Sequence, residues 1–71
     1  MMLNMEMLTL LLEKKFDNNQ SKMARALGVE RTHLNKIFRN NGKGAGANIC
    51  GAIIKYCKDH KLKLDDYIFL D

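Results

Sequence analysis

The sequence has no proline and no tryptophan, and only five of its 71 residues are phenylalanine or tyrosine. Proline interrupts helices, so its absence leaves every stretch of the chain free to become helical. With so few aromatic side chains, the chain has little material for the stacking platforms that bind RNA and other single-stranded nucleic acids. RNA binding is therefore the weakest of the nucleic-acid functions that the sequence leaves open.

Long apolar runs are also missing, and none reaches the roughly 20 residues that a membrane-spanning helix needs. The apolar N-terminal stretch lacks the basic region and the cleavage site of a signal peptide. We therefore expect a cytoplasmic protein with no membrane segment. The length predicts one domain over residues 1–71, with no separate effector-binding domain.

Cysteine is scarce, and Cys50 and Cys57 stand seven residues apart. On one helix they would share a face but lie about 10 Å apart along the axis, too far for a disulfide. Together with the two histidines they lack the spacing of a zinc finger. We expect both to be core residues, with no metal and no cofactor. The chain also lacks a phosphate-binding loop, a dinucleotide fingerprint and a recognisable nucleophile–base–acid set, so we expect neither an enzyme nor a small-molecule ligand.

Apolar residues recur at helical spacing along nearly the whole chain. We predict an all-α fold of four to five short helices with no substantial sheet. The predicted helices cover residues 3–16, 20–27, 31–39 and 47–60. Residues 64–69 form either a short fifth helix begun by two acids or an extended segment, because Tyr-Ile-Phe-Leu is also typical of a strand.

The predicted core follows one apolar stripe on each helix. Its members are Leu8, Leu11, Leu12, Phe16, Met23, Ala24, Leu27, Val29, Leu34, Ile37, Phe38, Ile49, Cys50, Ile53, Ile54 and Cys57. A second apolar line on the first helix, formed by Leu3, Met7 and Leu10, makes its apolar face wider than a small monomer needs. This width indicates either a well-buried helix or a surface for a partner.

The formal net charge of +4 comes from one segment. Residues 20–43 contain six Lys or Arg and a single Glu, whereas the segments on either side are close to neutral. Clustered positive charge is typical of a protein that binds a polyanion, although a solvated basic surface has the same composition.

The same segment meets the positional requirements of a helix-turn-helix, two helices joined by a tight turn. Ala24 is small where the two helices must approach closely, and Gly28 stands where the turn needs a left-handed backbone. Val29 is apolar at the corner. Two further apolar residues anchor the second helix, Leu34 and Ile37.

The polar residues of the predicted helix 31–39 form one exposed stripe, Thr32, Asn35, Lys36 and Arg39. An α-helix fits the major groove of DNA, where Arg and Lys donate to guanine and Asn pairs with adenine. Acids in the stripe would favour a protein partner, and it has none. Double-stranded DNA is therefore the expected partner, and a protein-interaction module such as an antirepressor is the alternative.

The segment from Gln20 to Asn40 resembles the helix-turn-helix of the Cro and lambda-repressor family. It has Gln-x-x-x-Ala-x-x-x-Gly-Val, followed by a helix with matching apolar residues, Leu34, Ile37 and Phe38. The loop over 40–46, the apolar helix after it and the acidic-apolar end resemble the rest of that five-helix fold. The resemblance implies a sequence-specific DNA-binding transcription regulator, expected to be a repressor of the phage or mobile-element type.

By position, the resemblance implies base contacts for Arg31, Thr32 and Lys36. Asn35 joins this set because it lies on the same exposed stripe. The resemblance also implies phosphate contacts for Gln20, Arg39, Asn40 and Asn41. We add Lys22 and Lys43, two cations that flank the predicted recognition helix. Glu30 departs from the family, which usually has Ser there as the helix N-cap. Glu is a poor cap, and it either accepts a hydrogen bond from cytosine or orients Arg31.

A single recognition helix reads only a few base pairs, so we expect a homodimer on an inverted repeat. The family resemblance places dimer contacts near the fifth helix, which favours the apolar C-terminal residues Ile68, Phe69 and Leu70. The second apolar line of the first helix is the alternative surface.

Overall fold

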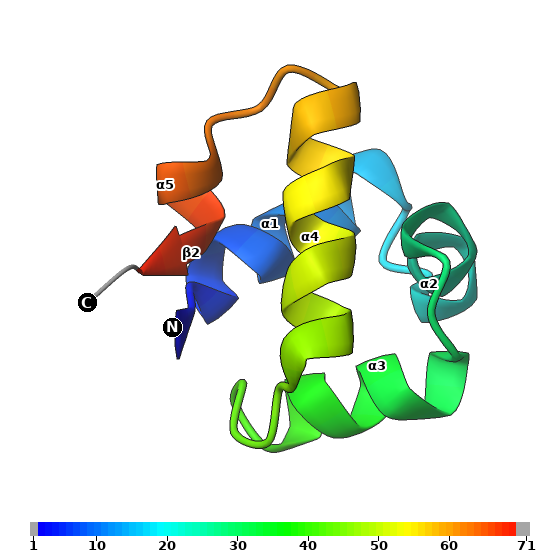
Figure 1. Cartoon of the computed structure of the whole chain (residues 1–71). Coiled ribbons are helices and arrows are strands. Elements are labelled where there is room, and N and C mark those ends of the chain that lie inside the picture. Colours follow the sequence, from blue (N-terminus) through cyan, green and yellow to red (C-terminus); the bar gives the residue numbers. More distant parts are fainter. Residues whose placement is uncertain (1, 70–71) are drawn as a thin grey trace.

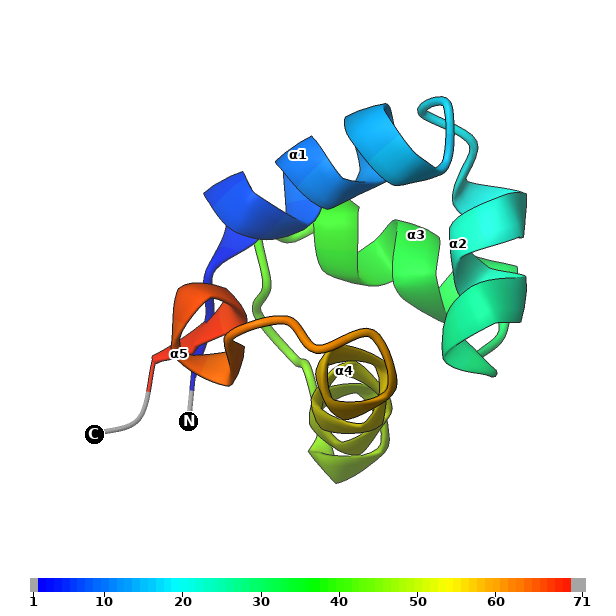
Figure 2. The same cartoon turned by 90° about the horizontal axis from the view of Figure 1, so that it is seen from above.

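A computed structural model describes residues 2–69, which form five short helices and one two-stranded sheet (Figure 1). The elements in chain order are β1 (Met2–Leu3), α1 (Met5–Lys15), α2 (Gln20–Leu27), α3 (Arg31–Arg39), α4 (Ala47–Asp59), α5 (Leu64–Tyr67) and β2 (Ile68–Phe69). The predicted, mostly helical fold with up to five short helices is confirmed. Helix α3 lies along one edge of the molecule, and α4 rises from that edge, with α1, α2 and α5 arranged around it (Figures 1 and 2).

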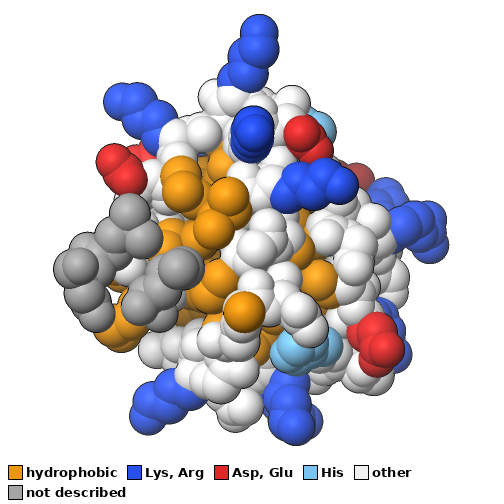
Figure 3. All heavy atoms as spheres, viewed as in Figure 1, with side chains coloured by type: hydrophobic (Ala, Val, Ile, Leu, Met, Phe, Trp, Pro, Cys, Tyr) orange, Lys and Arg blue, Asp and Glu red, His pale blue; other side chains and the backbone are white. Residues whose placement is uncertain are grey.

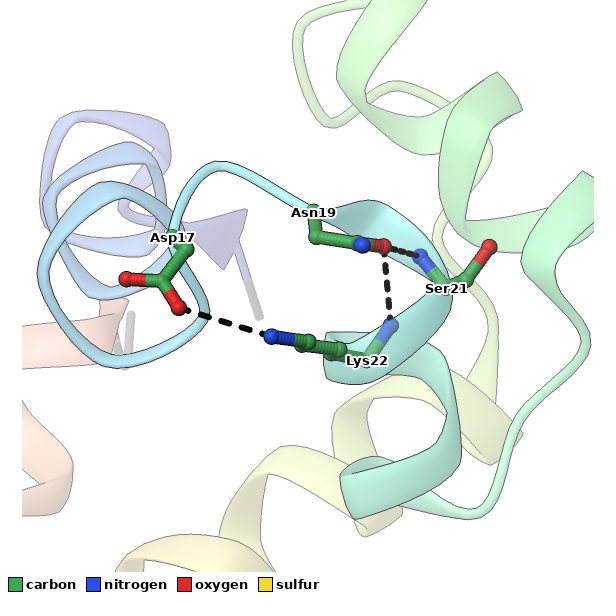
Figure 4. Close-up of polar contacts among 4 residues, drawn as sticks. All are labelled: Asp17, Asn19, Ser21 and Lys22. Carbon is green, nitrogen blue, oxygen red and sulfur yellow. Dashed lines mark hydrogen bonds and ion pairs between the residues drawn. The ribbon is translucent and has the colours of Figure 1, made fainter.

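Local capping sets the bounds of α2. The side chain of Asn19 accepts hydrogen bonds from two backbone N–H groups of the first turn, at 2.9 and 3.2 Å (Figure 4). At the other end, Gly28 has φ of +73°, so the predicted left-handed position is confirmed. The Val29 N–H donates to the carbonyl of Ala24 at 3.0 Å, which ends the helix and turns the chain toward α3.

The small sheet was not predicted. Strands β1 and β2 pair antiparallel, with Met2 opposite Phe69 and Leu3 opposite Ile68. Asn4 explains why residues 2 and 3 are free to pair as a strand. Its side chain accepts a hydrogen bond from the Met7 N–H at 3.3 Å, so α1 begins at residue 5 and not at residue 3. The backbone N–H of Asn4 also donates to the Tyr67 carbonyl at 2.8 Å, which holds the two ends of the fold together. Both alternatives for residues 64–69 therefore occur in turn, a helix to Tyr67 and then a strand.

The core contains apolar side chains from all five helices and both strands, and Met23, Ile49 and Ile68 are almost inaccessible. The prediction for Ile54 is wrong, since 37% of this residue is exposed. Ile49, Ile53 and Cys57 face the core at intervals of four residues, and Ile54 is turned about 100° from that line. Val29 and Phe38 are half-buried against the core.

Both cysteines are buried and free, as predicted for core residues. Burial raises the pKa of the Cys57 thiol, and the charge of Asp66 raises it further. The thiol is therefore held in its protonated, unreactive form. None of the helices in the described part of the chain is long and apolar enough to span a membrane.

The apolar residues expected to be in surplus divide into two groups. Leu3 and Ile68 are buried by the pairing of β1 with β2, and Met7 is half-buried. Leu10 and Phe69 stay exposed, at 42% and 51%. Leu70 was included in the same prediction and lies outside the described residues.

Candidate nucleic-acid interface

Helix α3 has one face in the core and one face in solvent. Leu34 and Ile37 are buried on the inner side and fix the helix against the rest of the molecule. The outer side carries four of the predicted contact residues, all exposed, namely Arg31, Thr32, Lys36 and Arg39. In the space-filling view, Lys and Arg side chains project from the lower edge, where α3 lies in Figure 1 (Figure 3).

Asn35, the fifth predicted member of this face, is half-buried. Its Nδ2 donates to Oε1 of Gln20 at 3.2 Å, and this contact ties the start of α2 to the middle of α3. Within residues 2–69, the other amide donors and acceptors of these two side chains have no protein partner. They therefore form a joined amide pair at the rim of the exposed face.

Glu30 occupies the N-cap position of α3 and makes no side-chain cap hydrogen bond. Its carboxylate is exposed beside Arg31. The predicted poor capping by Glu is confirmed, and the first-turn N–H groups of α3 have no side-chain cap. The predicted orientation of Arg31 by Glu30 does not occur in the described structure, because no hydrogen bond or ion pair joins these two side chains within residues 2–69.

The cations flanking α3 differ in their surroundings. Lys22 Nζ lies 3.4 Å from Asp17 Oδ2, and both side chains are largely exposed (Figure 4). An exposed pair of this kind is worth about 0–1 kcal/mol, so Lys22 can exchange it for another anion. In contacts among residues 2–69, Arg39 and Lys43 form no ion pair.

The loop between α3 and α4 carries the remaining predicted phosphate contacts, Asn40, Asn41 and Lys43, all exposed. Gly42 sets its path, with φ of +87° and an N–H that donates to the Ile37 carbonyl at 2.8 Å. A Cβ on Gly42 would lie 3.1 Å from Cγ and Sδ of the Met5 side chain, which would have to shift by a few tenths of an ångström, so it is mainly the positive φ that favours glycine here.

Sequence reasoning missed a groove of about 750 Å³ between the first half of α3 and α4. Helix α4 contributes Asn48, Gly51, Ala52 and Lys55 to it, and α3 contributes Thr32, His33 and Lys36. The apolar periodicity of α4 identifies its core residues and carries no signal for a groove on its outward face. Within residues 2–69, no three His, Cys, Asp or Glu side chains gather as a metal site.

Comparisons with models of known protein families, with curated proteins and with solved structures found no match to this chain.

Proposed function

We propose that the chain binds double-stranded DNA in a sequence-specific way and acts as a transcription regulator, with residues 20–39 as a helix-turn-helix. The observation that carries this proposal is the outer face of α3. Its exposed residues are two arginines, a lysine and a threonine, and they include no acid. The opposite face is fixed in the core, so the helix can present these side chains without rearrangement.

The dimensions of α3 suit the major groove. An α-helix with its side chains is about 10–12 Å in diameter, and the groove is about 12 Å wide. Arg31 and Thr32 lie in the first turn and Lys36 in the second, within reach of successive base edges. Arg and Lys donate to the O6 and N7 atoms of guanine, whereas Thr accepts or donates.

Asn35 is proposed to read a base together with Gln20. Their mutual hydrogen bond limits the rotation of both amides, so the free amide groups point in fixed directions. A fixed amide loses less entropy on binding than a free one. We expect adenine opposite this pair, because an amide offers the donor and acceptor that adenine requires.

Arg39, Asn40 and Lys43 are proposed to hold the phosphate backbone at the end of α3, with Asn41 beside them, and Gln20 and Lys22 to hold it at the start of α2. Gln20 lies beside Asn35 in the middle of α3 and Arg39 lies at its end, so phosphate contacts at both places would fix the register of α3 in the groove. Lys22 must exchange Asp17 for a phosphate, and we expect it to contribute less than Arg39 or Lys43.

Selection of bound sequences from random duplex DNA tests the proposal. Arg31→Ala and Lys36→Ala should each weaken binding to the selected site by about 1–3 kcal/mol and relax the preference at one base pair. Lys63→Ala is the matched control, because it removes an exposed lysine far from α3 in the sequence, beside α5. A selection that yields no preferred sequence would reject the function, and an unchanged preference in both α3 variants would reject α3 as the reader.

The chain would regulate by occupying an operator, and we expect repression by this route. Two recognition helices on an inverted repeat would double the number of base contacts.

A further inference from the structure

The groove of about 750 Å³ lies in the corner where α4 rises from α3 (Figure 1), and its floor carries no large side chain. Gly28 and Val29 of the α2–α3 turn line it from one side, and Gly51 and Ala52 of α4 line it from the other. A Cβ added at either glycine would meet nothing within 4 Å. Val29 and Ala52 pack against the core, so the floor is held in place. A partner can therefore approach the backbone of this floor closely, and the floor need not rearrange.

The walls of this groove carry hydrogen-bond donors and positive charge. Lys36 of α3 and Lys55 of α4 are both exposed, and neither forms an ion pair in the part of the chain that the structure describes. Asn48 adds an amide, and the only acid among the described lining residues is Glu30. The first turn of α3 also lines the groove, and its N–H groups, which lack a side-chain cap, make that end of the helix partly positive. The walls therefore favour an anionic occupant.

A smaller hollow of about 190 Å³ continues the groove along α4, because Ala52 and Lys55 line both. It adds Arg25 from α2 and Asp59 from α4, whose charges offset each other. From Asn48 to Asp59 the combined lining follows α4 for about 17 Å. This length matches about three turns of a bound helix or about five residues of an extended peptide.

The direction of the groove separates it from the edge proposed to bind DNA. Helix α4 rises away from α3 (Figure 1), and Lys55 stands about 12 Å along α4 from Ala47 at its start. A straight duplex that lies against the outer face of α3 therefore does not follow the groove to Lys55. The floor residues Val29 and Ala52 are apolar, which suits the side chains of a peptide better than phosphates. A flexible acidic peptide chain fits both the direction and the lining.

We propose that the groove between α3 and α4 binds an acidic segment of a protein partner, and that this partner excludes DNA from α3. Carboxylates of the segment pair with Lys36 and Lys55, and its apolar side chains cover the floor. Thr32 and Lys36 line the groove and also belong to the residues proposed to read bases, so the partner and an operator cannot use them at once. The exclusion of DNA rests on the proposed function, whereas the docking site does not. Such a partner would inhibit the regulator.

Selection of peptides from a random displayed library against the full chain, without DNA, tests the docking site. We expect the selected peptides to be rich in Asp and Glu with apolar residues between them, and fluorescence anisotropy of a labelled synthetic copy gives its affinity. Lys55→Glu should weaken binding of this peptide about tenfold at low salt, because a repulsion replaces an attraction. Lys58→Glu is the matched control, since it makes the same change at an exposed lysine of α4 that does not line the groove or its continuation. It should weaken binding by about twofold at most.

Gly51→Leu tests the groove without a change of charge. Leucine suits the interior of a helix and would fill the floor of the groove, so this variant should stay folded by circular dichroism and lose peptide binding. It should bind the duplex selected for the parent with the parent's affinity, because Gly51 is not one of the proposed DNA contacts. On the parent chain, the same duplex should displace the labelled peptide, and excess peptide should release the duplex.

A selection that yields no binding peptide, or peptides without acids, would overturn the proposal. So would peptide binding that survives both Lys55→Glu and Gly51→Leu. A loss of duplex binding in Lys55→Glu beyond that in Lys58→Glu would assign the groove to the DNA backbone instead. Peptide and duplex bound together would overturn the exclusion of DNA. A parent chain that binds the peptide and no duplex would reject the proposed function and leave the docking site standing.

Discussion

Gly28 gives the sharpest test of how the α2–α3 pair keeps its geometry. Its φ of +73° is left-handed, a conformation that costs an L-residue about 1–2 kcal/mol. A Cβ at this position would meet nothing within 4 Å, so no steric clash adds to that cost. Alanine also has fewer conformations than glycine in the unfolded chain, which offsets this cost by about 0.4–1 kcal/mol. The net loss in the free energy of unfolding for Gly28→Ala should therefore be about 1 kcal/mol.

Urea denaturation followed by circular dichroism measures this loss. For a small domain with a slope near 1 kcal/mol per molar urea, the midpoint should fall by about 1 M. Gly51→Ala is the matched control, because Gly51 lies inside α4 with nothing within 4 Å of its Cβ position. There the same change should stabilise the protein by about 0.5–1 kcal/mol. If Gly28→Ala were as stable as the parent, or if both changes had the same sign, the left-handed turn would not set the stability of this corner.

Two further predictions concern charge. Arg39→Ala and Lys43→Ala should each weaken binding to all duplexes alike and make the salt dependence shallower by about 0.9 per lost phosphate contact; a slope equal to that of the control Lys63→Ala would remove both residues from the interface. The free energy of unfolding should fall as the pH rises above about 9, the ordinary pKa of a thiol, because burial raises the pKa of Cys57 in the folded state and the unfolded chain ionises first. The pH dependence of the urea midpoint should be smaller in Cys57→Ala, and an equal dependence would assign it to other groups.

The parts of the fold that were predictable from sequence are those fixed by neighbouring residues. The bounds of α2 and α3 agree with the predicted 20–27 and 31–39, because Asn19 and Gly28 act within one turn of the helix ends they define. The exposed face of α3 was also predictable, since the same residues that anchor its inner side determine its outer side.

Features that depend on distant residues were not predictable. The pairing of β1 with β2 joins the two ends of the chain, and two-residue strands leave no alternating pattern in the sequence. The half-burial of Asn35 depends on Gln20, fifteen positions earlier. The exposure of Ile54 depends on which neighbours cover α4, and its periodicity with Cys50 and Cys57 favoured the core. In each case the deciding contact comes from another element of the fold.

The contact between the two ends has a consequence for how this chain folds. Closing the link between Asn4 and Asp66 brings together residues 62 positions apart, and the entropy lost on closing a loop grows with its length. The capped turns of α2 and α3 close loops of only a few residues and need no such search. Helices are therefore expected to form first, and the β1–β2 pair to close last, once the core has already brought the ends near each other. A groove of about 810 Å³ is lined by Met2 and Leu3 of β1, by Phe69 of β2 and by residues of α1, so it is completed only in that final step, and chains that have not finished folding do not present it.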